Sequence, residues 1–197
     1  MKKGYLLFTL GGLMLALVGC TSQPSPANEE AQAQRLVLVS SGNPSSVLPA
    51  FTTYSWSSDY TSVLSSVGSN NKNEFKAYIR EQIQAYLSTK GYQYTPNPEK
   101  AEVVFGFLFA LEDAIGNKTI QQRFGLLPGL QRNNVHQPRY KKGSFVLAVL
   151  DNKQQNIYWR SAVQGFVDIE KDRTEAQSNR MKGILGMMLG KFPQAGR

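Results

Sequence analysis

Apolar residues occur along the chain in short runs that have the spacing of strands and helices. In Phe51–Trp56 aromatic and small polar side chains alternate, which predicts a strand with one aromatic face. Residues 101–111 are apolar at both odd and even positions, a pattern typical of a central strand shielded from solvent. Residues 144–150 and 157–166 predict two further strands joined as a hairpin, and a short strand is expected at 35–39.

Two helices are predicted where apolar residues recur every three or four positions. The first covers residues 71–90, and Asn71 and Glu74 at its start have the spacing of a capping box. The second covers residues 174–191 and ends before Pro193, which cannot continue a helix. Their apolar stripes should pack on the sheet.

Three glycines interrupt the second predicted helix. Gly183, Gly186 and Gly190 each cost about 1 kcal/mol relative to Ala, so some other interaction should offset that cost. We interpret them as room for close packing of the helix on its own sheet. The alternative is a helix-association face formed by Gly186 and Gly190, four positions apart.

Two stretches without clear periodicity are predicted to be loops. Residues 57–70 are rich in Ser and Gly, and residues 112–142 include the sequence GLLPGL. The remaining elements predict one α/β (α+β) domain over residues 35–197, with two layers: a mostly antiparallel or mixed sheet of about four to five strands and two packed helices. Three large aromatic residues are assigned to its core rather than to a ligand site: Tyr54, Trp56 and Trp159.

The first residues of the chain have the organisation of a secretion signal. A positively charged start precedes an apolar run that is well below the roughly 20 residues needed to span a bilayer. The run ends in Leu17–Cys20 (LVGC), which resembles the lipobox of bacterial lipoproteins. The resemblance implies that residues 1–19 are a lipoprotein signal peptide, cleaved between Gly19 and Cys20, and that Cys20 carries a diacylglyceryl thioether and an amide-linked acyl chain. The alternative is a buried free cysteine.

Residues 20–34 join this anchor to the domain. They contain Pro, Ser and Gln without apolar periodicity, which predicts a flexible linker. In Gram-negative lipoproteins an Asp after the lipidated cysteine favours retention in the inner membrane, whereas this chain has Thr21. The resemblance therefore implies a lipid anchor in the outer membrane, with the domain expected to face the periplasm.

Several short motifs follow one another between residues 50 and 193. They are Phe51-x-x-Tyr54-x-Trp56, Lys90-Gly91-Tyr92, Ala101-Glu102-Val103-Val104, Gly143-Ser144-Phe145-Val146-x-x-Val149-x-Asp151, Tyr158-Trp159-Arg160-x-Ala162 and Phe192-Pro193. In this order they resemble the recurring blocks of bacterial lipoproteins in domain-of-unknown-function family 4136. The resemblance implies an envelope lipoprotein with an α/β domain and no assigned activity.

The composition excludes several kinds of chemistry. With one Cys and one His among 197 residues, the chain forms no intramolecular disulfide and no Cys/His zinc cluster. His136 lies in a polar stretch, where a solvated ring is commoner than a general base. Neither a Gly-rich phosphate loop nor a nucleophile elbow is present.

The carboxylates give no better candidate site. Asp168-x-Glu170-x-Asp172 is spaced like a calcium loop, but Arg173 stands where an EF-hand requires Gly. Glu112 and Asp113 are adjacent in sequence, so on a strand they would point to opposite sides. We therefore expect no catalytic residues, no metal site and no cofactor.

The stretch 112–142 carries the strongest local charge signal in a chain with a formal net charge of +8. Its cations have no acidic residue between them: Lys118, Arg123, Arg132, Arg139, Lys141 and Lys142. Together with neighbouring Leu and aromatic residues, they predict a binding surface for a phosphate-bearing lipid or an acidic protein. The alternative is an ordinary solvated loop. Nucleic acid is not expected as a partner, because a tethered envelope chain would seldom meet it.

These observations predict a non-catalytic binding or assembly module, held on the membrane by its N-terminal lipid, with an envelope protein as its possible partner. One alternative is a binder of anionic lipid or lipopolysaccharide that uses residues 118–142. The other is a hydrolase with an unrecognised carboxylate site.

Overall fold

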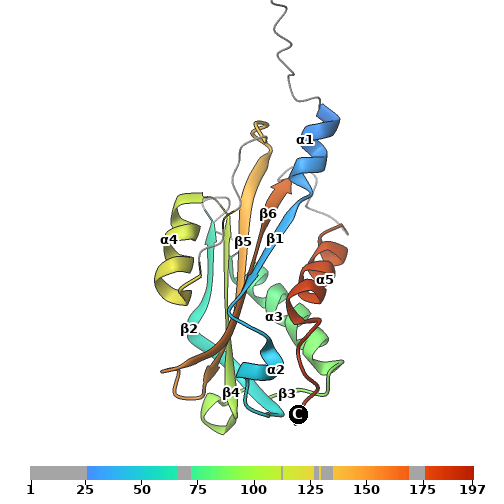
Figure 1. Cartoon of the computed structure of the whole chain (residues 1–197). Helices are drawn as coiled ribbons and strands as arrows, with labels where there is room; N and C mark the ends of the chain where they lie inside the picture. The colour runs from blue at the N-terminus through green and yellow to red at the C-terminus, as the bar shows by residue number, and fades with distance from the viewer. Residues whose placement is uncertain (1–25, 66–71, 112, 127–128, 130–134, 169–175) are drawn as a thin grey trace, which may run out of the picture.

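The computed structural model of the chain describes residues 26–65, 72–111, 113–126, 129, 135–168 and 176–197. These form one mixed sheet of six strands in the order β1-β6-β5-β4-β2-β3 (Figure 1). The strands are β1 (Leu36–Ser40), β2 (Thr53–Ser65), β3 (Gln93–Tyr94), β4 (Val103–Leu111), β5 (Tyr140–Asp151) and β6 (Ile157–Asp168). The helices are α1 (Pro26–Ala33), α2 (Pro44–Val47), α3 (Lys72–Ser88), α4 (Asp113–Phe124) and α5 (Ala176–Leu189).

The pairing of the strands confirms a mixed sheet, although it has more strands than the four to five predicted. β2 is parallel to both β3 and β4, because α3 carries the chain across between them. β4, β5, β6 and β1 pair antiparallel, and β5 and β6 form the predicted hairpin. β1 and β3 are the two edges. Within the described ranges, every helix is too short or too polar to cross a bilayer.

Helices cover both faces of the sheet, which corrects the predicted two-layer arrangement. Figure 1 shows α3 and α5 on one face and α4 on the other. The reason is the apolar character of β4 on both sides: Phe105 and Phe107 pack with α3 and α5, whereas Val104 and Leu108 pack with α4. A strand that is apolar on both faces needs cover on both.

The predicted loop at 112–142 is wrong for its two ends, because α4 occupies Asp113–Phe124 and β5 begins at Tyr140. α4 has few apolar residues, and among its described side chains Ile120 and Phe124 are fully buried. Two anchoring side chains give too weak a stripe to detect in the sequence. The helix is held by packing on the sheet rather than by its own propensity.

The predicted loop at 57–70 is wrong over 57–65, because β2 continues to Ser65. The parallel pairing with β4 shifts register between Trp56 and Thr61 and then resumes. The Ser57 hydroxyl accepts a 2.9 Å hydrogen bond from the backbone N–H of Tyr60 inside this irregularity. The loop-like composition of residues 57–65 therefore comes from polar residues in a β-bulge.

Part of the predicted flexible linker at 20–34 is helical, since α1 spans Pro26–Ala33. Pro at the first helical position followed by Ala, Glu and Gln suits a short helix. Ala33 is buried in a small cluster with Val135, Tyr140 and Phe166. The end of α1 is thereby fixed to the start of β5.

All three aromatic side chains assigned to the core are buried there, although Trp56 also lines a groove beside α3. Tyr54 is 1% exposed, Trp56 7% and Trp159 1%. They share one large apolar cluster with α3 and α5. Burial raises the pKa of the Tyr54 hydroxyl, and the neighbouring Tyr94 raises it further.

The interpretation of the α5 glycines as room for packing on the sheet is wrong, because none of the three has a close contact with a strand. A methyl group built at Gly183 or Gly186 would have no atom within 4 Å outside the neighbouring helix backbone. At Gly190 it would lie 2.5 Å from the carbonyl oxygen of Gly186. The close contact at Gly190, just beyond the end of α5, is therefore with the backbone of the same helix, and nothing in the structure explains the other two glycines.

Candidate functional site

The cations predicted to form one binding surface lie on different parts of the fold. Lys118 and Arg123 are exposed on α4. Lys141 and Lys142 are neighbours in β5, so they point to opposite faces of the sheet. Lys142 is only 6% exposed. Arg132 lies outside the described residues.

Arg139 is used in contacts within the domain. Its Nε lies 3.6 Å from Oδ2 of Asp168, and its Nη2 donates a 2.9 Å hydrogen bond to the hydroxyl of Tyr140. Its guanidinium carbon also lies 4.8 Å from the centre of the Tyr140 ring. These contacts hold the guanidinium beside the start of β5 rather than leaving it for a ligand.

The other candidate residues give no catalytic or metal arrangement. His136 is exposed before β5, and Asp168 faces Arg139. In the part of the chain that the structure describes, no three His, Cys, Asp or Glu side chains are placed to hold a metal ion. Several predicted positions lie outside that part: Gly19, Cys20, Glu112, Glu170 and Asp172.

An open groove of about 510 Å³ lies between α3 and the neighbouring parts of β2 and β3. We call it the α3 groove, and its lining residues are Trp56, Asn73, Lys76, Ala77, Arg80, Gln84 and Tyr94. Two of these side chains are cationic and two are amides, and none is acidic. A second, smaller cavity is lined mainly by apolar residues with Arg180 as its cation, so the α3 groove differs from it in having two cations and two amides.

The helical spacing of α3 explains the polar side of this groove. Asn73, Lys76, Arg80 and Gln84 recur at intervals of three and four positions and therefore lie along one side of the helix. The adjacent apolar stripe is buried against the sheet. Packing of the stripe fixes the rotation of α3, and that rotation turns the polar side toward β2 and β3.

Arg80 is the most unusual residue in the α3 groove. Its guanidinium carbon lies 5.5 Å from the centre of the Trp56 ring, which favours the cation. Its Nε is buried and makes no hydrogen bond. No carboxylate in the described ranges forms an ion pair with it. Burial of a hydrogen-bond donor without an acceptor costs free energy. A ligand with an anionic or carbonyl oxygen that accepts a hydrogen bond from Arg80 would therefore be favoured.

Lys76 adds a second positive charge one helical turn away. Burial lowers the pKa of the Lys76 ammonium, and the charge of Arg80 lowers it further. Like charges four positions apart destabilise a helix by about 0.2–0.5 kcal/mol. This pair therefore lowers the stability of the folded protein when no anion is bound. An anion bound between the two groups would offset their repulsion.

The remaining lining residues offer hydrogen bonds and an aromatic face. Asn73 is exposed and Gln84 half-buried, and each amide provides both donors and an acceptor. Tyr94 is 44% exposed, and its ring centre lies 5.9 Å from that of the buried Tyr54. Tyr94 is thus a supported ring at the rim of the groove, with much of its surface open to solvent.

The sequence analysis missed the α3 groove because it searched for charge density along the chain. Lys76 and Arg80 are only two cations, and α3 also carries Glu74 and Glu81. The one available signal was the like-charged pair at a spacing of four on the side of an amphipathic helix. The aromatic side of the groove comes from β2 and β3, which no local pattern places beside α3.

The fold and groove define a mixed α+β domain with an open groove that carries two cations. The chain belongs to the family described as "Domain of unknown function (DUF4136)", whose model matches residues 39–194. This confirms the family resemblance of the sequence motifs. No curated protein matches the chain.

The solved structures that match this chain share little sequence with it. The PelC dodecamer from Paraburkholderia phytofirmans is 8% identical with a TM-score of 0.48, and the match covers 83% of this chain and 100% of that one. A DUF4136 family protein from Bacteroides thetaiotaomicron is 14% identical with a TM-score of 0.46, covering 81% and 98%. A PDZ domain protein from Parabacteroides distasonis is 13% identical with a TM-score of 0.38, covering 87% and 40%.

Proposed function

We propose that this protein is a lipid-anchored lipoprotein of the outer membrane, facing the periplasm, and that it is a non-catalytic module that binds an anionic ligand in the α3 groove. The lipobox-like Leu17–Cys20 supports the anchor. The observation that carries the binding role is the pair Lys76 and Arg80, which line one groove without any acidic neighbour in its lining. Absence of a carboxylate from this lining also gives no support to a hydrolase at this site.

The geometry favours a ligand with carboxylate or phosphate oxygens. An Arg guanidinium presents a planar set of donors that matches such groups, and charge-assisted hydrogen bonds are stronger than neutral ones. Arg80 already lies against Trp56, so binding loses little side-chain freedom. Lys76 can add a charge from the same helix side.

The binding role is tested by thermal unfolding of the full-length protein in citrate, a small tricarboxylate, with NaCl at matched ionic strength as reference. Citrate at tenfold its dissociation constant should stabilise the fold by about 1.4 kcal/mol, which raises the Tm by roughly 3–6 °C. The double variant Lys76→Ser/Arg80→Ser should lose this increase.

A matched control removes the same charge elsewhere. Lys118→Ser/Arg123→Ser takes two exposed cations from α4, so its stabilisation by citrate should equal that of the wild type. Loss of the citrate effect in this control, with retention in the Lys76/Arg80 variant, would instead support the anionic-lipid alternative that uses residues 118–142.

Anion binding should weaken at alkaline pH because of Lys76. Its pKa is lowered from 10.5, so it loses its charge before an exposed lysine does as the pH rises. Bound anion favours the charged form, and affinity therefore falls as Lys76 deprotonates. Calorimetric titration with citrate between neutral pH and pH 10 should show this decline in the wild type. Lys76→Arg, which stays charged, should remove it; an unchanged decline in this variant would assign it to another group.

A further inference from the structure

The Tyr94 side of the α3 groove lies far from α1, the described helix that follows the predicted anchor in sequence. At one end Ala33 of α1 is buried against Tyr140, the first residue of β5. Towards the other end, Trp56 aligns through Phe105 with Val149, near the end of β5. Nine residues of strand separate Tyr140 from Val149, which corresponds to roughly 30 Å.

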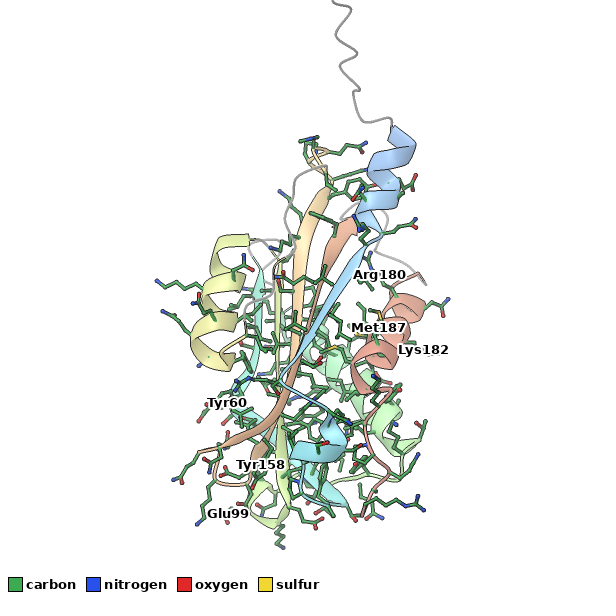
Figure 2. All side chains as sticks on the ribbon, in the orientation of Figure 1. Tyr60, Glu99, Tyr158, Arg180, Lys182 and Met187 are labelled. Carbon is green, nitrogen blue, oxygen red and sulfur yellow. The ribbon has the colours of Figure 1, made fainter. Side chains whose placement is uncertain are left out.

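The figures agree with this placement. Figure 1 shows α1 at one end of the molecule and β3, which carries Tyr94, at the other. In Figure 2, Glu99 in the short helical turn after β3 lies at the end remote from α1. The Tyr94 side of the groove is therefore remote from α1, the described segment nearest in sequence to Cys20.

This placement selects among anionic ligands. The headgroups of the anchoring membrane would lie at the α1 end, where charged surfaces attract one another only within about 8–10 Å at physiological ionic strength. Charge on that membrane would therefore be screened from the Trp56 part of the groove.

The lining of the groove indicates the chemistry of its ligand. Asn73 and Gln84 can donate to and accept from hydroxyl groups, and the open ring of Tyr94 offers an apolar face. Lys76 and Arg80 suit carboxylates. A sugar ring with a carboxylate presents all three features: hydroxyl edges, an apolar face of C–H groups and an anionic group.

We propose that the α3 groove binds a carboxylate-bearing glycan. This rests on the proposed function, from which it takes the anchor and the anion-binding groove. It adds the class of ligand: a sugar polymer rather than a lipid headgroup or a small free anion.

The test uses the full-length lipidated protein in neutral detergent micelles and measures binding by calorimetry. Oligogalacturonate, which has a carboxylate on every ring, should bind, whereas its fully methyl-esterified form should bind at least about 10-fold more weakly, because charge-assisted hydrogen bonds are lost. Asn73→Asp adds a negative charge at an exposed position of the groove and should weaken binding by a similar factor without risk to the core. Lys118→Ser/Arg123→Ser should bind as the wild type does.

Equal affinity for the charged and esterified oligomers, or unchanged binding by Asn73→Asp, would overturn the proposal. So would tighter binding of short-chain phosphatidylglycerol than of oligogalacturonate. Stabilisation by citrate without binding of oligogalacturonate would leave the anion site standing and remove the glycan. Retention on purified peptidoglycan sacculi would support a cell-wall glycan, and retention on immobilised oligogalacturonate alone a secreted one.

Discussion

Gly106→Ala is expected to destabilise the fold by about 3 kcal/mol, because overpacking a close backbone contact has few ways to relax. A Cβ at this position would lie 2.4 Å from Cβ of Tyr60 and 2.9 Å from its carbonyl oxygen. Neither atom can move by a side-chain rotation. The irregular segment of β2 crosses directly over β4 here, so relief requires displacement of one of two paired strands. Thermal unfolding should show a Tm lower by roughly 6–12 °C.

Gly183→Ala provides the matched comparison for the same chemical change. The added methyl group meets nothing within 4 Å, and the position is inside α5. Ala is favoured over Gly in a helix interior by about 0.5–1 kcal/mol, so this variant should unfold at a higher temperature than the wild type. If Gly106→Ala left the Tm unchanged, the close crossing of β2 over β4 would be wrong.

Cys20→Ala is expected to move the protein entirely from the membrane to the soluble fraction or to stop its maturation. The predicted anchor consists of three acyl chains, and each buried methylene contributes about 0.8 kcal/mol to membrane binding. A single myristoyl chain gives only marginal binding, so three chains should hold the protein firmly. The described helices supply no alternative span. Fractionation of cells followed by an alkaline wash of the membranes measures the change.

A second variant separates anchoring from sorting. Thr21→Asp keeps the lipidated cysteine but introduces the residue that, in Gram-negative lipoproteins, favours retention in the inner membrane. It should remain membrane-bound and shift to the inner-membrane density. Retention of Cys20→Ala in washed membranes would contradict a lipid anchor at this position.

The strands that form the centre of the sheet were predictable because their signal is local. β4, and β5 from Phe145 to Leu150, present apolar side chains on both faces of the sheet. Such runs are stable where both faces are covered, as in the centre of a sheet. By contrast, α4 is defined by the surface it covers, and the second half of β2 by a bulge over Gly106. Both depend on partners distant in sequence, so composition alone indicated loops.

The candidate site was less predictable than the fold. Charge density along the sequence grouped Lys118, Arg139 and Lys142, but the structure distributes them over an exposed helix, an internal ion pair and a buried strand position. The α3 groove joins Arg80 to Trp56, which are 24 positions apart and are brought together by packing of α3 on the sheet. Pairing of this kind leaves no local pattern.

The central claim is that the Arg80 guanidinium binds an anion. The most direct measurement of this claim is the NMR signal of the Arg80 side-chain N–H in a ¹⁵N-labelled sample. On titration with citrate at constant ionic strength, the Arg80 Nε–H signal should shift to saturation and exchange more slowly with water, while that of Arg123 on α4 stays in place. An Arg80 signal that does not move while the Arg123 signal does would contradict the account.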